Sequence, residues 1–180
     1  MCDHPAPLTD FNAVRYMGNW FEQQHKQFGE PPNCVQSQYY GLDLETATFQ
    51  LTNSGQSATF GERKGGSGFG YCPDKSGQCH IKFHEDADYP AEANYNVVDT
   101  DYDSYSIVQG CGKFDRAFVY LMTREAVISE DLYNHMMAIV AEKLPNFDPS
   151  TFSPRDYQGP LCNYAPMPSG EASFEASFLQ

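Results

Sequence analysis

The sequence predicts an all-β domain, a sandwich or an up-and-down barrel of antiparallel strands, with one helix near its C-terminal end. Between Phe11 and Arg124, short β-prone runs alternate with turn clusters, which is typical of both architectures. Aromatic residues make up 14% of the chain, and flat rings pack well on pleated surfaces. The 180 residues fit a single domain with a substantial core.

The predicted strands are short and follow one another closely. Residues 53–55 and 64–68 contain glycines and are interpreted as turns. Cys72 and Cys79 flank a short polar loop that we interpret as a hairpin turn pinned by a disulfide. The expected strands lie at 36–44, 47–52, 58–63, 78–84, 93–98, 104–111 and 116–123.

One segment has helical rather than alternating periodicity. Ser129 is the expected N-cap, and two acidic residues follow it at the positive end of the helix dipole. Pro145 ends the pattern. The spacing of Leu132, Met136, Ile139, Val140 and Lys143 gives one apolar stripe, so the helix is expected to cover the strands from outside.

Composition excludes several function classes. The net charge of −13, with 11 Lys and Arg residues, disfavours binding to nucleic acid or to anionic lipid. No stretch approaches the roughly 20 apolar residues of a transmembrane segment. Six cysteines without a Cys-x-x-Cys pair indicate disulfides in an oxidising compartment rather than zinc. We expect a secreted mature form whose leader was removed, because residues 1–5 contain no apolar stretch.

Three motifs occur in order along the chain. Gly18-Asn19-Trp20 comes first, Thr100-Asp101-Tyr102 follows, and Arg124 ends the last predicted strand before the helix. Together they resemble the signatures of the lipocalin family, over about residues 5–164. The resemblance implies an eight-stranded antiparallel up-and-down β-barrel, the lipocalin calyx, with one C-terminal α-helix packed outside.

The resemblance also implies structural roles for the motif residues. The Trp20 ring would form the floor of the barrel, and Arg124 would stack on it as a cation–π pair. Gly18, Asp101 and Tyr102 would shape the same end of the barrel. None of these residues is expected to be catalytic.

Within the family, the chain is most similar to the group of apolipoprotein D, the insect bilin-binding proteins and the crustacyanins. The cysteines carry this similarity. It implies disulfides Cys2–Cys111 and Cys34–Cys162, which leaves Cys72 to pair with Cys79, one of 15 possible connectivities. The last pair departs from the apolipoprotein D pattern.

Strand alternation then predicts which side chains face the barrel interior, because successive residues point to opposite faces. Tyr39 and Tyr120 also align with pocket residues of apolipoprotein D. The same alternation predicts interior positions for Val97, Ile107 and Met122. The predicted ligand-binding residues are Glu22, Gln24, Ser37, Tyr39, Leu51, Asn53, Tyr95, Tyr105, Phe118 and Tyr120.

Such a mixture of rings, hydroxyls and amides suits a small apolar ligand with a few polar groups. The expected function is therefore transport or storage of a small hydrophobic ligand, for example a lipid, fatty acid or sterol. A first alternative is a coloration protein that binds a bilin or carotenoid chromophore.

A lipid- or carotenoid-modifying enzyme is a further alternative, and a disfavoured one. The expected pairing of all six cysteines leaves no reactive thiolate. His80 and His84 would lie about 13 Å apart on a strand, too far for one metal ion. His25 and His135 are expected at the surface. We predict no catalytic residue, no metal site and no catalytic cofactor.

The predicted organisation is one domain over residues 1–164 and a flexible tail over residues 165–180, which is rich in Pro, Ser and Ala. The sequence does not indicate an oligomeric state.

Overall fold

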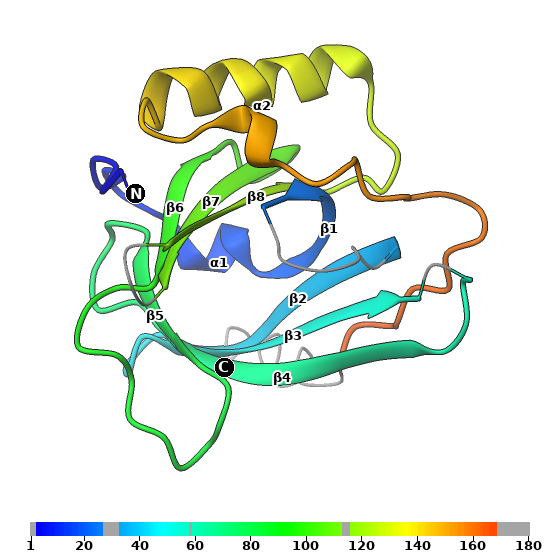
Figure 1. Cartoon of the computed structure of the whole chain (residues 1–180). Helices are drawn as coiled ribbons and strands as arrows, with labels where there is room; N and C mark the ends of the chain where they lie inside the picture. Colours follow the sequence, from blue (N-terminus) through cyan, green and yellow to red (C-terminus); the bar gives the residue numbers. More distant parts are fainter. Residues whose placement is uncertain (1–2, 27–32, 58, 113–115, 169–180) are drawn as a thin grey trace.

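Eight antiparallel strands form a closed barrel in simple up-and-down order, with β8 pairing back onto β1 (Figure 1). This computed structural model describes residues 3–26, 33–57, 59–112 and 116–168. The predicted barrel is confirmed. Its strands are β1 Gly18–His25, β2 Asn33–Asp43, β3 Thr48–Gln56, β4 Arg63–Tyr71, β5 Gln78–Lys82, β6 Tyr95–Thr100, β7 Tyr105–Gly112 and β8 Arg116–Thr123.

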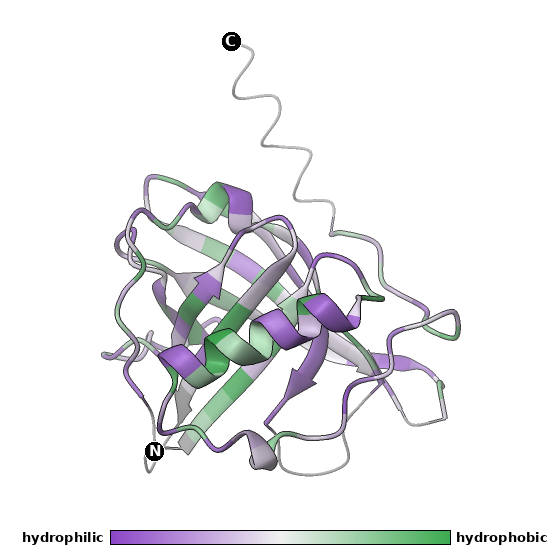
Figure 2. Cartoon of the chain, turned by 90° about the horizontal axis from the view of Figure 1, so that it is seen from above, coloured by the Kyte–Doolittle hydropathy of each residue, from purple (hydrophilic) through white to green (hydrophobic). Residues whose placement is uncertain are grey.

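Helix α2 (Glu130–Lys143) covers one side of the barrel from outside, as predicted (Figures 1 and 2). The Ser129 side chain caps it by accepting a hydrogen bond from the Leu132 amide, 3.2 Å away. Met136, Ile139 and Val140 are buried and pack against the outer faces of β6, β7 and β8. The other helical elements are α1 (Ala13–Tyr16) and a 3₁₀ turn at Pro149–Thr151.

The turns predicted at 53–55 and 64–68 are wrong, because both segments belong to the paired strands β3 and β4. The strand predicted at 58–63 is also wrong, since β4 begins only at Arg63. The glycines allow close packing here. A Cβ atom on Gly65 would lie 2.1 Å from the Asn53 carbonyl oxygen, and one on Gly70 would lie 2.0 Å from the Phe49 ring.

Two of the predicted disulfides are confirmed. Cys34–Cys162 links the start of β2 to the segment that follows α2, and Cys72–Cys79 closes the loop between β4 and β5. The predicted Cys2–Cys111 pair lies outside the residues whose side chains the structure describes.

The barrel wall has a gap between β1 and β2, which pair only from Gly18–Tyr39 to Phe21–Gln36. Residues 153–158, here called the wall segment, fill this gap, and the Cys34–Cys162 disulfide lies just beyond them. The hydrogen bonds that tie in the wall segment are Ser153 N to His25 O (3.0 Å), Asp156 N to Gln23 O (2.9 Å), Cys34 N to Tyr157 O (2.8 Å), and Gln158 Nε2 to Glu22 O (2.8 Å) and Val35 O (2.9 Å).

The chain stays in contact with the barrel beyond residue 164. The Ala165 amide donates to the Gln36 side chain, and the Pro166 carbonyl accepts from Gln38. The rest of the predicted tail, residues 169–180, lies outside the described residues, so the predicted domain boundary stays a prediction. Over the described part of the chain, no helix is long and apolar enough to cross a membrane.

Candidate functional site: the barrel interior

The two ends of the barrel differ in how they are closed. The up-and-down order brings the C-terminal ends of β1, β3, β5 and β7 to one end, here called the mouth, and α1 lies at the other, the closed end. At the closed end Trp20 is fully buried, and its indole N–H donates to the Tyr16 carbonyl oxygen at 2.9 Å. The Arg124 guanidinium lies 3.7 Å from the Trp20 ring centre, so the predicted stacking contact is present.

Arg124 also ties the surrounding loops to the floor. It donates to the carbonyl oxygens of Asn19 (2.8 Å), Arg15 (2.7 Å) and Tyr102 (2.9 Å). Gly18 has a φ of +102°, and a Cβ atom there would lie 3.2 Å from the same guanidinium. These contacts agree with a structural role for Arg124 and Gly18.

The Asp101 carboxylate organises the turn that follows β6. It accepts hydrogen bonds from the amides of Asp103, Ser104 and Tyr105 at 2.8–3.1 Å. Burial opposes ionisation, yet these bonds and that of the Ser104 hydroxyl hold the pKa of Asp101 below its usual value. This turn presents the Tyr102 carbonyl to Arg124.

Three tyrosines fill the barrel next to the floor. The Tyr95 hydroxyl lies 2.8 Å from the hydroxyls of both Tyr16 and Tyr39, and Tyr16 also contacts the Ser106 hydroxyl. Burial raises the pKa of Tyr16 to about 12 and the pKa values of Tyr39 and Tyr95 well above their usual range. All three side chains are therefore neutral, and space for a ligand begins on their mouth side.

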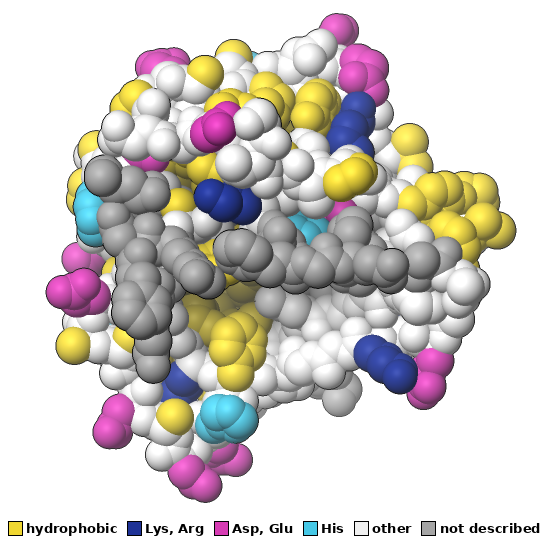
Figure 3. All heavy atoms as spheres, viewed as in Figure 1, with side chains coloured by type: hydrophobic (Ala, Val, Ile, Leu, Met, Phe, Trp, Pro, Cys, Tyr) yellow, Lys and Arg dark blue, Asp and Glu magenta, His cyan; other side chains and the backbone are white. Residues whose placement is uncertain are grey.

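A cavity of about 250 Å³ lies between these tyrosines and the mouth. Eight of the ten predicted ligand-binding residues line it, and so does Met122. Hydrophobic side chains are visible inside a hollow in the face shown in Figure 3. The lining residues are Glu22, Ser37, Tyr39, Leu51, Asn53, Ile81, Phe83, Asn94, Tyr95, Gly110, Phe118, Tyr120 and Met122.

The interior positions predicted for Tyr105 and Ile107 are wrong. Both side chains pack outside the barrel with α2, and the Tyr105 hydroxyl donates to Asp99. On β7 the inward residues are instead Ser106 and Val108. Because α2 covers the outer face of β7, residues on both faces of this strand are buried, so hydrophobicity does not distinguish the two faces. Val97 does face inward, but it packs with the core near the floor rather than on the cavity.

The interior position predicted for Gln24 is also wrong, because the pairing of β1 with β8 shifts between Glu22 and Gln24. Gln24 points outward, where it donates to the Ser153 carbonyl at 2.5 Å and accepts a hydrogen bond from Tyr133 on α2. After the bulge His25 turns inward. The predicted surface position of His25 is wrong, since the residue is fully buried, whereas His135 is exposed as expected.

His25 belongs to a buried ionic cluster behind the cavity wall. Its Nδ1 atom contacts the Glu22 carboxylate and lies 3.3 Å from the Asp156 carboxylate of the wall segment. Side-chain exposure is 8% for Glu22, 1% for His25 and 0% for Asp156. The ring of Tyr120, a lining residue, stacks beside His25 at 6.4 Å. Of the three cluster residues, Glu22 lines the cavity, and the other two lie behind it.

The cluster holds a charged imidazole. Burial alone would lower the pKa of His25, but its hydrogen bonds to Asp156 and Glu22 outweigh burial and raise that pKa to about 10. Burial raises the pKa of Asp156 to about 7 in spite of the His25 contact, and the Glu22 charge adds to the rise. Two carboxylates thus share one imidazolium.

These three residues could also hold a metal ion, since their ligand atoms lie within 4.8 Å of one another. Sequence reasoning missed the set because the bulge hides the inward turn of His25, and Asp156 comes from a segment without secondary structure. In the structure, hydrogen-bonded ion pairs already link the three groups.

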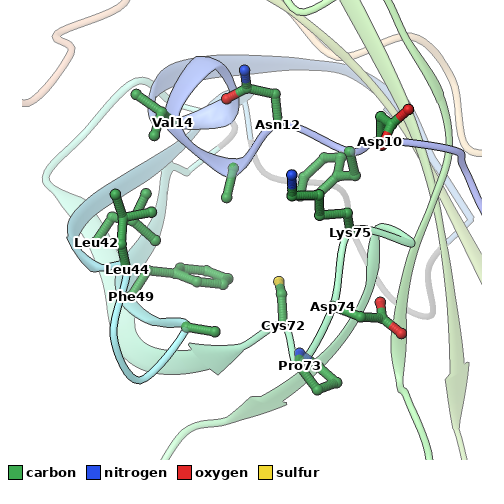
Figure 4. A pocket seen from close by; sticks show the side chains of 13 residues that line it. Asp10, Asn12, Val14, Leu42, Leu44, Phe49, Cys72, Pro73, Asp74 and Lys75 are labelled. Carbon is green, nitrogen blue, oxygen red and sulfur yellow. The ribbon is translucent and has the colours of Figure 1, made fainter.

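A larger groove of about 540 Å³ lies at the closed end, between α1 and the loops after β2 and β4 (Figure 4). Apolar residues such as Leu42, Leu44 and Phe49 line it together with Asp10, Asp74 and Lys75. Leu44 is 57% exposed, whereas the lining residues Phe11 and Phe49 belong to the buried core. We favour the smaller cavity as the ligand site, because inward-facing strand residues line it and it carries a buried ionic group.

The chain matches the lipocalin-like domain family over residues 11–155, and it therefore belongs to this family. It is 29% identical over 120 residues to the Lazarillo protein of Schistocerca americana, a match that covers 62% of this chain and 52% of Lazarillo. The match thus spans about half the length of that relative.

Solved structures agree on the fold. Insecticyanin from the tobacco hornworm Manduca sexta superposes with a TM-score of 0.71 at 19% identity, covering 92% of this chain and 90% of insecticyanin. Lobster apocrustacyanin A1 superposes with a TM-score of 0.59 at 18% identity, covering 88% and 93%. The predicted membership of the lipocalin family is confirmed, and these insect and crustacean proteins share the fold.

Proposed function

We propose that this protein is a secreted carrier that holds a small, largely apolar molecule inside the barrel, for transport or storage. The observation that carries the proposal is the interior cavity, whose walls of Leu51, Ile81, Phe118 and Met122 are apolar. A few polar groups among them, such as Asn53 and Ser37, are positioned to orient a ligand.

The volume of the cavity limits the size of a fully enclosed ligand. At about 250 Å³, the cavity is smaller than the roughly 300–1,000 Å³ of typical small-molecule pockets. This suits a ligand with one or two rings, or part of a fatty acid chain. A sterol, bilin or carotenoid would have to displace the walls or extend through the mouth.

The coloration alternative rests on the similarity to insecticyanin and apocrustacyanin, which supports the fold. Its test is the absorption spectrum of protein isolated from its natural source. A visible band that disappears on solvent extraction would favour a chromophore, and its absence would favour a colourless ligand.

The carrier function is tested by titrating delipidated protein with a fatty acid, biliverdin and astaxanthin while following the fluorescence of Trp20, the only tryptophan. Tyr120→Ala should weaken binding by about 1–3 kcal/mol, because its half-buried ring faces the cavity. Tyr39→Phe removes a hydroxyl without opening the core and should have a smaller effect.

Two controls locate the site. Tyr133→Ala removes a ring of similar size from α2, outside the barrel, and should leave the affinity unchanged. Removal of residues 169–180 should also leave the ligand affinity unchanged. Unchanged affinity in both cavity variants, with binding lost on truncation, would place the site outside the barrel and overturn the proposal.

A further inference from the structure

The cavity contains one formally charged side chain among the described residues that line it. Glu22 is that residue, and the other twelve are apolar, aromatic, hydroxyl or amide side chains or glycine. An isolated carboxylate in a mostly apolar cavity would be costly to bury. The ion pair between Glu22 and His25 offsets this cost.

The groups behind Glu22 do not neutralise the site. His25 supplies one positive charge, and Asp156 supplies a second carboxylate that contacts the same nitrogen. Above the Asp156 pKa of about 7, the two carboxylates and the imidazolium together carry a net charge of −1 on the wall of a mostly apolar cavity. Electrostatic interactions are stronger in such surroundings than in solution. An anionic headgroup is therefore repelled, and a cation is attracted.

The mouth has the same sign. The loop between β5 and β6, residues 83–94, contains Glu85, Asp86, Asp88 and Glu92 and no Lys or Arg. Acidic side chains gather at the lower end of the view in Figure 3, where this loop lies in Figure 1. With a chain charge of −13, this negative potential raises the local concentration of cations and lowers that of anions.

The remaining lining can accommodate a cation with an apolar body. The Tyr120 ring lies beside the ionic cluster, and Phe118 lines the same cavity on the same strand. Aromatic faces attract ammonium groups and also pack against apolar ligands. The volume of about 250 Å³ is sufficient for an aryl-alkyl or short alkyl body.

We propose that the barrel takes a small apolar amine in its protonated form, with the Glu22 carboxylate accepting the ammonium hydrogen bonds and His25 and Asp156 acting as positioning residues. The inference rests on the proposed function, and it names the class of ligand for the same cavity. It also predicts that fatty acids bind less well than amines of equal length.

The test compares three ligands with one body: 2-phenylethylamine, 2-phenylethanol and phenylacetate. Calorimetric titration at pH 7.5 should rank them in that order, with the amine at least about tenfold tighter than the alcohol, as expected for a charge-assisted hydrogen bond. Glu22→Gln keeps the shape of the side chain and should reduce this ratio to within about threefold. Glu45→Gln removes an exposed carboxylate from the loop between β2 and β3, at the closed end, and should leave the ratio unchanged.

The outcomes separate the two proposals. Equal affinities of the wild type for amine and alcohol, both weakened by Tyr120→Ala, would overturn charge selection and leave the carrier function intact. The ranking is measured on the wild type, so an unstable Glu22→Gln variant does not prevent this result. If none of the three ligands binds and a fatty acid does not bind either, both proposals are wrong.

Discussion

The closed end and the mouth side of this barrel each contain a buried cationic side chain, but the two cations have different partners. At the closed end, Arg124 lies over Trp20 and donates to three backbone carbonyls, so a single cation joins loops far apart in sequence. On the mouth side, His25 contacts two carboxylates in the gap between β1 and β2. The first cation binds neutral partners and the second binds anions.

The difference lies in what each arrangement leaves available. The carbonyls around Arg124 carry no net charge, and the ring beneath it is fully buried, so the floor presents no charged group to the interior cavity. The mouth-side cluster retains one carboxylate on the cavity wall. The contacts at the closed end therefore stabilise the fold. The cluster has a desolvation cost, because its charges are buried, and it leaves a charged group at the binding site.

The largest predicted effect concerns the closed end. Trp20→Ala should destabilise the protein by about 3–5 kcal/mol, because it empties a fully buried aromatic site. Urea denaturation monitored by far-UV circular dichroism gives the free energy of unfolding. A variant as stable as the parent would show that Trp20 is not the floor of the barrel.

The next effect concerns how the mouth side is held. Replacing Cys34 and Cys162 together by serine should cost about 2–4 kcal/mol, because this disulfide links residues 128 apart. Hydrogen exchange should also accelerate in the wall segment. The matched control, Cys72→Ser with Cys79→Ser, opens a link across only 7 residues and should cost less. The account would be contradicted if the variant without Cys34–Cys162 showed unchanged exchange in the wall segment and faster exchange in the β4–β5 loop instead.

The two regions also differ in how far the sequence predicts them. The floor residues sit in the three motifs that resemble the lipocalin signatures, and this resemblance places Trp20, Arg124 and the Asp101 turn as the structure has them. The inward positions on β2, β3 and β8 follow from regular alternation, because pairing is continuous from Gln36–Ser54 to Tyr40–Gln50 and from Tyr105–Thr123 to Gly112–Arg116.

The ionic cluster is not predictable by the same reasoning. Its formation needs a bulge in β1, which reverses the facing of every later residue on that strand, and a partner 131 residues away in an irregular segment. The turn predicted within the glycine-rich β4 is wrong for a related reason. Glycines that favour turns in isolation are here required by close contacts with Asn53 and Phe49 across the sheet.

A pH titration can test the mouth-side cluster without any ligand. A folded-state pKa of about 10 for His25 means that its contribution to stability is complete below the unfolded value of 6.5 and is lost as pH rises toward 10. The pKa of Asp156 is raised to about 7, so this residue also makes the protein less stable as pH rises toward 7. The groups that face His25 are Glu22, Asp156 and Tyr120.

Between pH 7.5 and 9, His25 should therefore dominate the pH dependence. The free energy of unfolding of the wild type should fall by about 1–2 kcal/mol across this window. His25 releases one proton on unfolding, which corresponds to about 1.4 kcal/mol per pH unit. His25→Gln should be less stable at pH 7.5 and show a flatter profile. Parallel profiles for both proteins would mean that the imidazole is not charged in the folded state.

The smallest effect compares two arginines that each donate three hydrogen bonds, one at either end of the barrel. Arg63, on the mouth side, donates to Asn163 O, Ser54 Oγ and Cys34 O, and its guanidinium lies 5.6 Å from the Tyr164 ring centre. Arg124 has the closer stacking distance of 3.7 Å over a buried indole. Lysine keeps the charge but lacks the planar fork that reaches several acceptors at once. Arg124→Lys should therefore cost about 1–2 kcal/mol and Arg63→Lys about 0.5–1 kcal/mol.

Thermal melts of the two variants at equal pH and salt measure the difference. If Arg63→Lys destabilises the protein as much as Arg124→Lys does, stacking on Trp20 contributes nothing beyond the hydrogen bonds, and the closed end owes its stability to burial of the indole alone.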